Sequence, residues 1–333
     1  MIASQIQQTL FQRLKEQLPA HVSLADEVAS LLEISSDSAY RRIRGEKSIS
    51  LEELQKICSR FRLSVDQVLN LQTDAFLFSG QLTNSSEYSF ETWMQTDIKH
   101  LETILSFKQR HLYYLAKEIP FFYYFVVPEI TAFKSFFFKK SILHYENLKG
   151  VKFSLNDNHD EVIALGRQIC QYFTQIPSTE IWNVENLTST IRQIEFYKLT
   201  GILRSESEVS HILNKLGELL DHIERQAAEG RKFMPGEPIA ETAAPVNMYI
   251  NELIMGDNLI LAQLDNLYVT YINHSIINFI TTRDPRFTAY TRQTLENITN
   301  KSTPVSGVNE KARIKFFSRI HDKINRARTE LCH

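Results

Sequence analysis

Apolar residues within positions 1–71 recur at intervals of three or four, the spacing that places them on one face of an α-helix. Residues that cap or end helices divide this pattern, since Ser23 can cap the second stretch and Gly45 ends the third. Ser50 and Glu53 form an S-x-x-E capping box before the fourth stretch. The pattern predicts five short helices, over residues 4–18, 24–32, 36–44, 51–61 and 64–69. Helices so short and so closely joined predict one compact helical domain.

The chain continues with a predicted linker and a second helical region. Residues 72–89 form the linker, because Ser, Thr, Asn and Asp are frequent there and Gly80 interrupts them. Helical spacing returns at Phe90, and it predicts a helical domain over residues 90–230. Its expected helices span residues 90–105, 111–119, 130–145, 161–174, 183–199 and 206–229. No interval repeats regularly enough to indicate a repeat protein.

Glycines and prolines between residues 230 and 247 interrupt the helical pattern a second time. Short β-branched or aromatic stretches then alternate with turn signals, as in antiparallel strands. The expected strands span residues 246–250, 259–263, 267–271 and 275–280, and two closing helices span residues 285–300 and 310–331. We therefore predict a small α+β region over residues 231–333, packed on the helical domain. The expected fold class is mainly α, with a small antiparallel sheet near the end of the chain.

Charge is informative only locally. The formal net charge of the 333 residues is −2, so no global field attracts the chain to nucleic acid. Between Ser36 and Arg62, however, seven Lys or Arg residues face four acidic residues. This excess favours nucleic-acid binding by the N-terminal domain. The alternative interpretation is a solvated helix face in a bundle that binds protein.

Several motifs are absent from the sequence, and their absence indicates the cellular location and the chemistry to expect. Cys58, Cys170 and Cys332 are far apart and form no CxxC pair, which is typical of reduced thiols in a cytoplasmic protein. The most apolar stretch, residues 119–127, is far shorter than the ~20 residues of a membrane-spanning helix, so no membrane partner is expected. No GxGxxG, Walker A, GxSxG or HExxH spacing occurs, so we expect no cofactor, no metal site and no enzymatic activity.

The second to fourth predicted helices carry a set of spaced features. Val28-Ala29 place a small residue where two helices cross, Leu32 and Ile34-Ser35 surround a turn, and Arg44-Gly45 close the next helix. These residues resemble the phage-repressor and Cro-like (XRE-type) helix-turn-helix family of bacteria and their phages. The resemblance implies a five-helix, lambda-repressor-like DNA-binding domain in a bacterial transcription regulator.

The resemblance also implies where double-stranded DNA binds. The helix at residues 36–44 is then expected in the major groove, with its N-terminal half at the base edges. The base-reading candidates are Ser36, Asp37, Ser38, Tyr40 and Arg41. The phosphate-binding candidates, which position the protein without reading sequence, are Arg44, Lys47 and Ser48.

Two residues depart from the family pattern. Glu33 stands where the family has a turn glycine, and because positive φ is costly for Glu, a different backbone conformation is expected there. Arg42 stands where the recognition helix usually has an apolar residue, and Ile43 follows it. The helix is therefore expected to be rotated, or to begin one residue off.

A dimer and an effector complete the expected regulator. Specificity usually needs two half-sites about 34 Å apart, bound by a symmetric dimer. The apolar stripe of residues 206–229 is the predicted source of dimer contacts, with intramolecular core as the equal alternative. Residues 121–138 hold nine aromatics, which suggest either core packing or a pocket for a small apolar effector. The polar groups of such a pocket would be Tyr123, Tyr124, Glu129 and Lys134.

The sequence thus predicts a sequence-specific DNA-binding transcription regulator, a homodimer whose C-terminal region serves dimerisation and effector binding. Two alternatives stay open. One is a helical scaffold protein whose first domain binds protein. The other is an enzyme whose C-terminal active site carries no recognisable motif.

Overall fold

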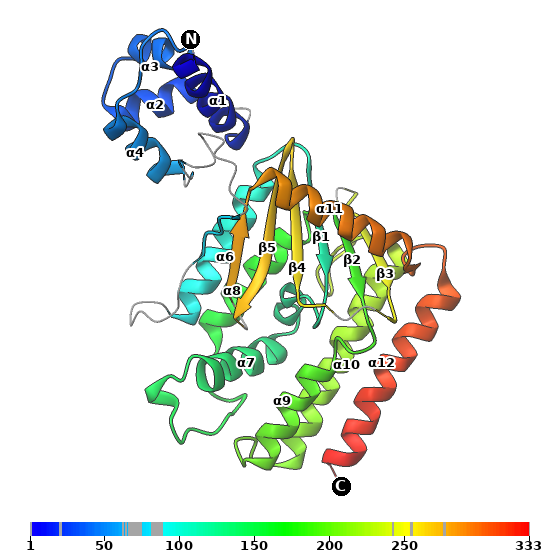
Figure 1. Ribbon diagram of the computed structural model, residues 1–333. Coiled ribbons are helices and arrows are strands. Elements are labelled where there is room, and N and C mark those ends of the chain that lie inside the picture. The colour runs from blue at the N-terminus through cyan, green and yellow to red at the C-terminus, as the bar shows by residue number, and fades with distance from the viewer. Residues whose placement is uncertain are drawn as a thin grey trace.

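The computed structural model describes residues 2–19, 22–61, 63, 65, 75–80, 89–241, 243–253, 256–275 and 278–332. Its N-terminal domain, at the upper left of Figure 1, is built from helices α1 (Ile2–Gln17), α2 (Leu24–Leu32), α3 (Ser36–Ile43) and α4 (Leu51–Phe61). The first four predicted helices are therefore present. Of the fifth, residues 64 and 66–69 lie outside the described residues.

The N-terminal domain has a hydrophobic core of its own and capped helices. Its core side chains come from all four helices: Leu10, Phe11, Leu14, Val28, Ala29, Leu32, Ala39 and Ile57. The predicted capping box is confirmed, because the Glu53 amide donates to Ser50 Oγ at 3.2 Å and the Ser50 amide donates to Glu53 Oε2 at 3.1 Å. Ser23 Oγ likewise accepts from the Asp26 amide at 3.4 Å. Local sequence thus sets where these helices begin.

The rest of the chain is organised around a sheet. Its described strands are β1 (Arg110–Leu115), β2 (Ser178–Trp182), β3 (Val246–Ile250), β4 (Leu259–Leu264), β5 (Leu267–Ser275), β6 (Asn278–Thr282) and β7 (Thr303–Pro304). They lie in the order β6-β5-β4-β1-β2-β3-β7. β1, β2 and β3 run parallel, β4 pairs antiparallel with β1, and β4, β5 and β6 form an antiparallel meander. The fold is therefore a mixed sheet with helices, and the prediction of a mainly α chain with a small antiparallel sheet is wrong.

The error lies in two central strands. A helix was expected over residues 111–119, but residues 110–115 form β1, and β2 falls in a segment for which no strand was expected. All five residues of β2 are buried, so the alternation of polar and apolar positions that marks a half-exposed strand is missing. A short, fully buried strand cannot be distinguished from a piece of buried helix by periodicity.

Helices cover both faces of the sheet (Figure 1). Leu295 and Ile298 of α11 pack on one face, against Leu115, Ile181 and Leu261. A larger core, which includes residues of α6, α7, α8, α9, α10 and α12, lies against the other face. The bounds are α6 (Phe90–Leu105), α7 (Pro128–Phe137), α8 (Asp160–Phe173), α9 (Thr188–Leu199), α10 (Glu206–Glu229), α11 (Pro285–Asn300) and α12 (Glu310–Leu331), with 3-10 turns η1 (Phe121–Phe125) and η3 (Glu146–Leu148) and a π-helical turn η2 (Phe138–Ile142). Among the described residues, no helix combines the length and apolar character needed to cross a membrane.

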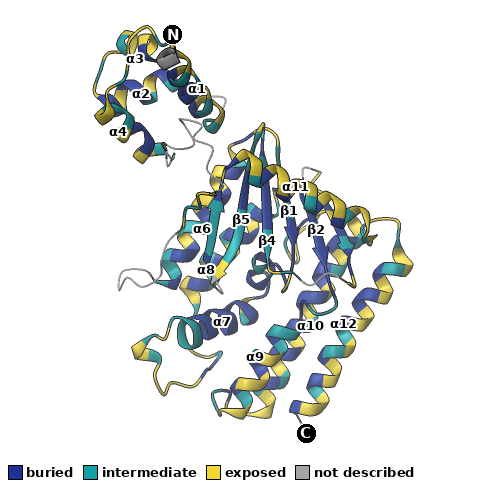
Figure 2. Cartoon of the chain, viewed as in Figure 1, coloured by how far each residue is buried: buried dark blue, intermediate teal, exposed yellow. Residues whose placement is uncertain are grey.

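The long apolar stripe of α10 belongs to this larger core. Val209, Ile212, Leu216, Leu220 and Ile223 are each fully buried within the chain, where α10 packs along α12 (Figure 2). Because a buried side chain cannot also meet a second copy, the stripe is not a source of dimer contacts. Of its two predicted roles, intramolecular packing is the one observed.

Candidate nucleic-acid interface

The recognition helix is held by its inner face and leaves its outer face to solvent. Ala39 of α3 is fully buried against the α2 side, where a small residue lets the two helices cross closely. Ser35 caps α3, because its Oγ accepts from the Ser38 amide at 3.3 Å. Among the predicted base-reading residues, Ser36, Asp37, Tyr40 and Arg41 are exposed. Ser38 is only half-exposed, and its Oγ accepts from Ser35 Oγ at 3.1 Å.

The turn before α3 corrects the expectation for Glu33. This residue keeps the left-handed conformation, with φ 55° and ψ 45°, although it carries a side chain. Two backbone hydrogen bonds hold it there: the Ile34 amide donates to Ala29 O at 3.0 Å and the Glu33 amide donates to Ser30 O at 3.4 Å. The partly buried side chain of Ile34 packs on the domain core. These contacts offset the local strain, so the turn needs no glycine.

Arg42 occupies an inward position of α3, where the resemblance to Cro-like domains predicted an apolar residue. Its side chain is 6% exposed, and its guanidinium binds both carboxylate oxygens of Glu53, with Nη2–Oε1 at 2.7 Å and Nε–Oε2 at 3.1 Å. Hydrogen bonding to Arg42 lowers the pKa of Glu53 below its ordinary value. The charge of Arg42 is therefore neutralised inside the domain, and the helix does not need the expected rotation to exclude it.

Gln7 of α1 holds the loop that follows the recognition helix. Its Nε2 donates to Arg42 O at 2.7 Å and to Lys47 O at 2.8 Å, and its Oε1 accepts from the Ile49 amide at 3.1 Å. Sequence reasoning missed this residue. The signal was a glutamine on the apolar face of α1, one turn before Leu10, because a polar side chain at an inward position must find partners.

The phosphate-binding candidates lie around this loop. Arg44, Lys47 and Ser48 are all exposed, which is what contacts to a DNA backbone require. Glu46 lies among the cations, with Oε1 3.4 Å from Arg44 Nη1 and Oε2 4.0 Å from Arg41 Nε. The surface is therefore basic but partly neutralised.

The four residues predicted for an effector pocket do not all meet. Tyr124 and Lys134 lie together, with Lys134 Nζ 4.0 Å from the centre of the Tyr124 ring, whereas Tyr123 and Glu129 have other partners. Tyr123 donates to both carboxylate oxygens of buried Glu180 at 3.1 Å, whereas Tyr124 Oη lies 2.9 Å from Thr190 Oγ1. Lys134 is buried and donates to Gln193 Oε1 at 2.8 Å, and burial lowers its pKa to about 8. Glu129 accepts from Lys215 Nζ at 3.3 Å nearer the surface. Of the four, Tyr124 lines a cavity of about 330 Å³, and much of the aromatic run is core.

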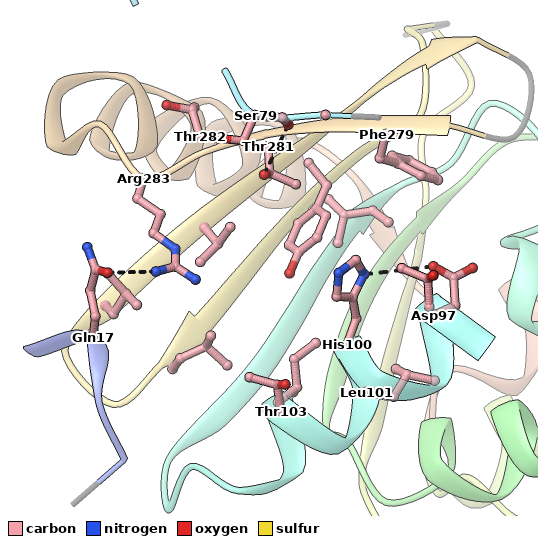
Figure 3. Close-up of a pocket in the computed structure, with 18 of the residues that line it drawn as sticks. Gln17, Ser79, Asp97, His100, Leu101, Thr103, Phe279, Thr281, Thr282 and Arg283 are labelled. Carbon is pink, nitrogen blue, oxygen red and sulfur yellow. Dashed lines mark hydrogen bonds and ion pairs between the residues drawn. The ribbon is translucent and has the colours of Figure 1, made fainter. Parts of the chain in front are cut away.

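A larger cavity, of about 680 Å³, lies between α6 and the strands β4, β5 and β6 (Figure 3). Apolar side chains from α6, η1 and the sheet line it, and Asp97 of α6 lies among them. Sequence reasoning missed this site too. Asp97 stands between Trp93 and Leu101 on the apolar face of α6, and a carboxylate in that stripe was the available signal.

Comparison with known proteins found one family that matches the N-terminal domain. Residues 3–86 match the family model described as the BetR domain, a helix-turn-helix-like DNA-binding domain family. The match contains α1 to α4, and with them the exposed face of α3. The N-terminal part of the chain is thus a DNA-binding regulatory domain. No curated protein and no solved structure matches the chain.

Proposed function

We propose that the protein is a sequence-specific transcription regulator that reads double-stranded DNA with α3, in the manner of Cro-like helix-turn-helix proteins. The observation that carries the proposal is the division of α3 into two faces. Ala39 and Arg42 are buried, whereas Ser36, Asp37, Tyr40 and Arg41 are exposed on the helix and can enter a major groove.

The exposed residues divide by chemistry into two groups. Arg41 can bind O6 and N7 of a guanine together, and Ser36 and Asp37 can accept from base amino groups. Arg44, Lys47 and Ser48 follow the helix and are placed to contact phosphates, which would fix the depth and direction of α3 in the groove. Ser38 contributes less to readout than predicted, because its hydroxyl is already bonded to Ser35.

We propose further that two copies bind together. The eight residues of α3 reach only a few base pairs, so discrimination against a genome calls for two half-sites and a symmetric homodimer. The apolar stripe of α10 is buried and does not supply the contacts, so the proposed dimer is built from another surface.

The C-terminal region has a regulatory role in this proposal and binds a small effector instead of catalysing a reaction.

Selection of bound sequences from random DNA tests the proposal directly. We expect an enriched motif with two-fold symmetry, and we expect Arg41→Ala to relax the preference at one position of each half-site at a cost of about 1–3 kcal/mol. Lys15→Ala, at an exposed cation of α1 outside the proposed interface, is the control. A scaffold protein whose first domain binds protein would give no enriched motif and no steep loss of DNA binding with salt.

A further inference from the structure

Asp97 is an acidic side chain on the apolar face of α6, and its side chain is 16% exposed. Its Oδ2 is buried and finds no hydrogen-bond partner among the described residues, and its Oδ1 lies 3.9 Å from His100 Nδ1. A carboxylate oxygen without a partner is costly to bury. Natural proteins keep such a group where something outside the resting structure completes it.

The space that Asp97 meets is large enough for a small molecule. The cavity of about 680 Å³ falls within the range of ligand sites, and its walls combine apolar side chains with polar and charged ones. Trp93, Phe121 and Phe279 add aromatic rings to these walls. Figure 3 shows Asp97 and His100 together on α6, with Leu101 beside them and Phe279 on the sheet opposite. An apolar molecule with one polar group fits this arrangement.

The sign of that polar group follows from the groups around Asp97. His100 faces it from α6. Burial, and to a smaller extent the nearby Asp97, raises the pKa values of the Tyr114 phenol on β1 and the Tyr271 phenol on β5. Arg13 and Glu16 of α1, Arg60 of α4 and Arg283 also line the cavity, and Arg283 donates to Gln17 Oε1 at 2.9 Å. Burial raises the pKa of Asp97 to about 8, as expected for an acid that lacks a cationic partner. An ammonium group would supply the missing charge and the missing donor, and aromatic walls favour cations.

The cavity walls also include residues of the segment that connects the DNA-binding domain to the C-terminal region. Leu77, Ser79 and Gly80 belong to the segment that leads from that domain, and Ser79 pairs with Thr281 of β6 through bonds of 2.8 and 2.7 Å. Gln17 of α1 and Phe61 of α4 line the same cavity. The cavity therefore borders the C-terminal region, the connecting segment and the DNA-binding domain at once.

Resting on the proposed function, we infer that this cavity is the effector site of the regulator and that its ligand is a hydrophobic amine, whose ammonium group pairs with Asp97. Binding changes the placement of the DNA-binding domain against β6, and through it the affinity for DNA. By linkage, DNA changes the affinity for the amine by the same factor.

Dansylcadaverine, an apolar fluorophore with a primary amine, is the probe, and its N-acetyl derivative is the uncharged control. We expect the full-length protein to bind the amine about tenfold or more tightly than the acetylated form, by fluorescence titration. Asp97→Asn should abolish this preference. Glu102→Gln, which removes an exposed carboxylate from the same helix, should retain it. Equal binding of the two probes, or a preference that survives Asp97→Asn, overturns the inference.

A second measurement separates this inference from the proposed function. Saturating dansylcadaverine should change the affinity for a selected DNA about fivefold or more, by fluorescence anisotropy. If the protein binds no DNA but prefers the amine through Asp97, the site stands and the proposed function fails. If DNA binds and the amine has no preference, the effector site fails alone. An amine that binds through Asp97 without changing DNA affinity overturns the regulatory role of the cavity.

Discussion

Arg42 of α3 and Glu53 of α4 form a two-pronged ion pair, with Nη2–Oε1 at 2.7 Å and Nε–Oε2 at 3.1 Å. The same Glu53 oxygen that binds Arg42 Nε also accepts from the Ser50 amide at 3.1 Å. One carboxylate therefore caps α4 and orients α3. α3, the proposed recognition helix, is therefore held in place by an ion pair.

Loss of this carboxylate should loosen the recognition helix. We expect Glu53→Gln to destabilise the N-terminal domain by about 1–3 kcal/mol, because the buried guanidinium of Arg42 loses its counter-ion. Faster hydrogen exchange at the amides of Arg44 and Gly45, which bond to α3 carbonyls, would report the change. Glu52→Gln, at an exposed neighbouring carboxylate, is the control and should have little effect.

The same pair predicts a response to acid. The pKa of Glu53 is lowered in the folded protein, chiefly by its hydrogen bond to Arg42, from an ordinary value of 4.5. A lowered acid pKa means that the unfolded state binds more protons, so the stabilisation is complete above pH 4.5 and is lost as the pH falls through the folded pKa. Acid titration of wild type against Glu53→Gln should show the two stability curves converging below that range. Parallel curves would contradict the assignment.

Gln7 should affect DNA binding without touching DNA. Gln7→Ala removes one hydrogen bond to α3 and two to the loop that carries Lys47 and Ser48, and each removed bond leaves a backbone group in need of a partner. We expect about 1–3 kcal/mol of lost domain stability and weaker DNA binding with the enriched motif unchanged. Gln12→Ala, at an exposed position of the same helix, is the control. A changed motif would mean that Gln7 reads bases directly.

Glu46 should weaken DNA binding in the wild-type protein. Its carboxylate lies 3.4 Å from Arg44 and 4.0 Å from Arg41, so it competes with phosphate for both cations. We expect Glu46→Gln to raise affinity by about twofold to fivefold at low salt, since exposed ion pairs contribute up to ~1 kcal/mol. Asp26→Asn makes the same change of net charge elsewhere in the domain. If both variants bind equally more tightly, net charge and not position is responsible.

Asp97 should make stability fall as the pH rises. Its pKa is raised from 3.8 to about 8, so the folded protein binds the proton more tightly and loses stability as the pH rises between these values. Asp97→Asn should flatten the dependence and raise the unfolding free energy at pH 8 by about 1–3 kcal/mol. Thermal unfolding from pH 5 to pH 9, with Glu102→Gln as control, measures both effects. A wild-type curve that rises across this range would refute the assignment.

Gly80 should be needed for the connecting segment to pair with β6. A Cβ at this position would lie 2.8 Å from Cγ2 of Ile280, closer than two carbons can approach. We expect Gly80→Ala to displace the segment and to increase hydrogen exchange at the Thr281 amide, which donates to Ser79 O at 2.7 Å. Gly217→Ala is the control, because nothing lies within 4 Å of a Cβ there and alanine favours a helix.

Local sequence determined the helices and turns whose energetics lie within a few residues. The Ser50 and Glu53 capping box is observed as predicted, and α10 and α11 begin and end where spacing and breakers indicated. The same holds for β3, which is flanked by clear turn residues. For these helices the interactions that decide the structure are made within one helix, so the order of residues is enough to predict them. β3 is marked by its flanking turn residues, although its pairing partners β2 and β7 are distant in the sequence.

Tertiary structure alone decided the sheet, the buried polar contacts and the cavity. β1 and β2 pair through residues more than 60 positions apart, and the burial of all five β2 residues removes the periodic signal of a strand there. The roles of Gln7 and Arg42 depend on partners in other helices. The sequence shows Asp97 only as a polar residue on the apolar face of α6. The packing of α6 against the sheet buries Asp97 Oδ2 and leaves it without a hydrogen-bond partner among the described residues.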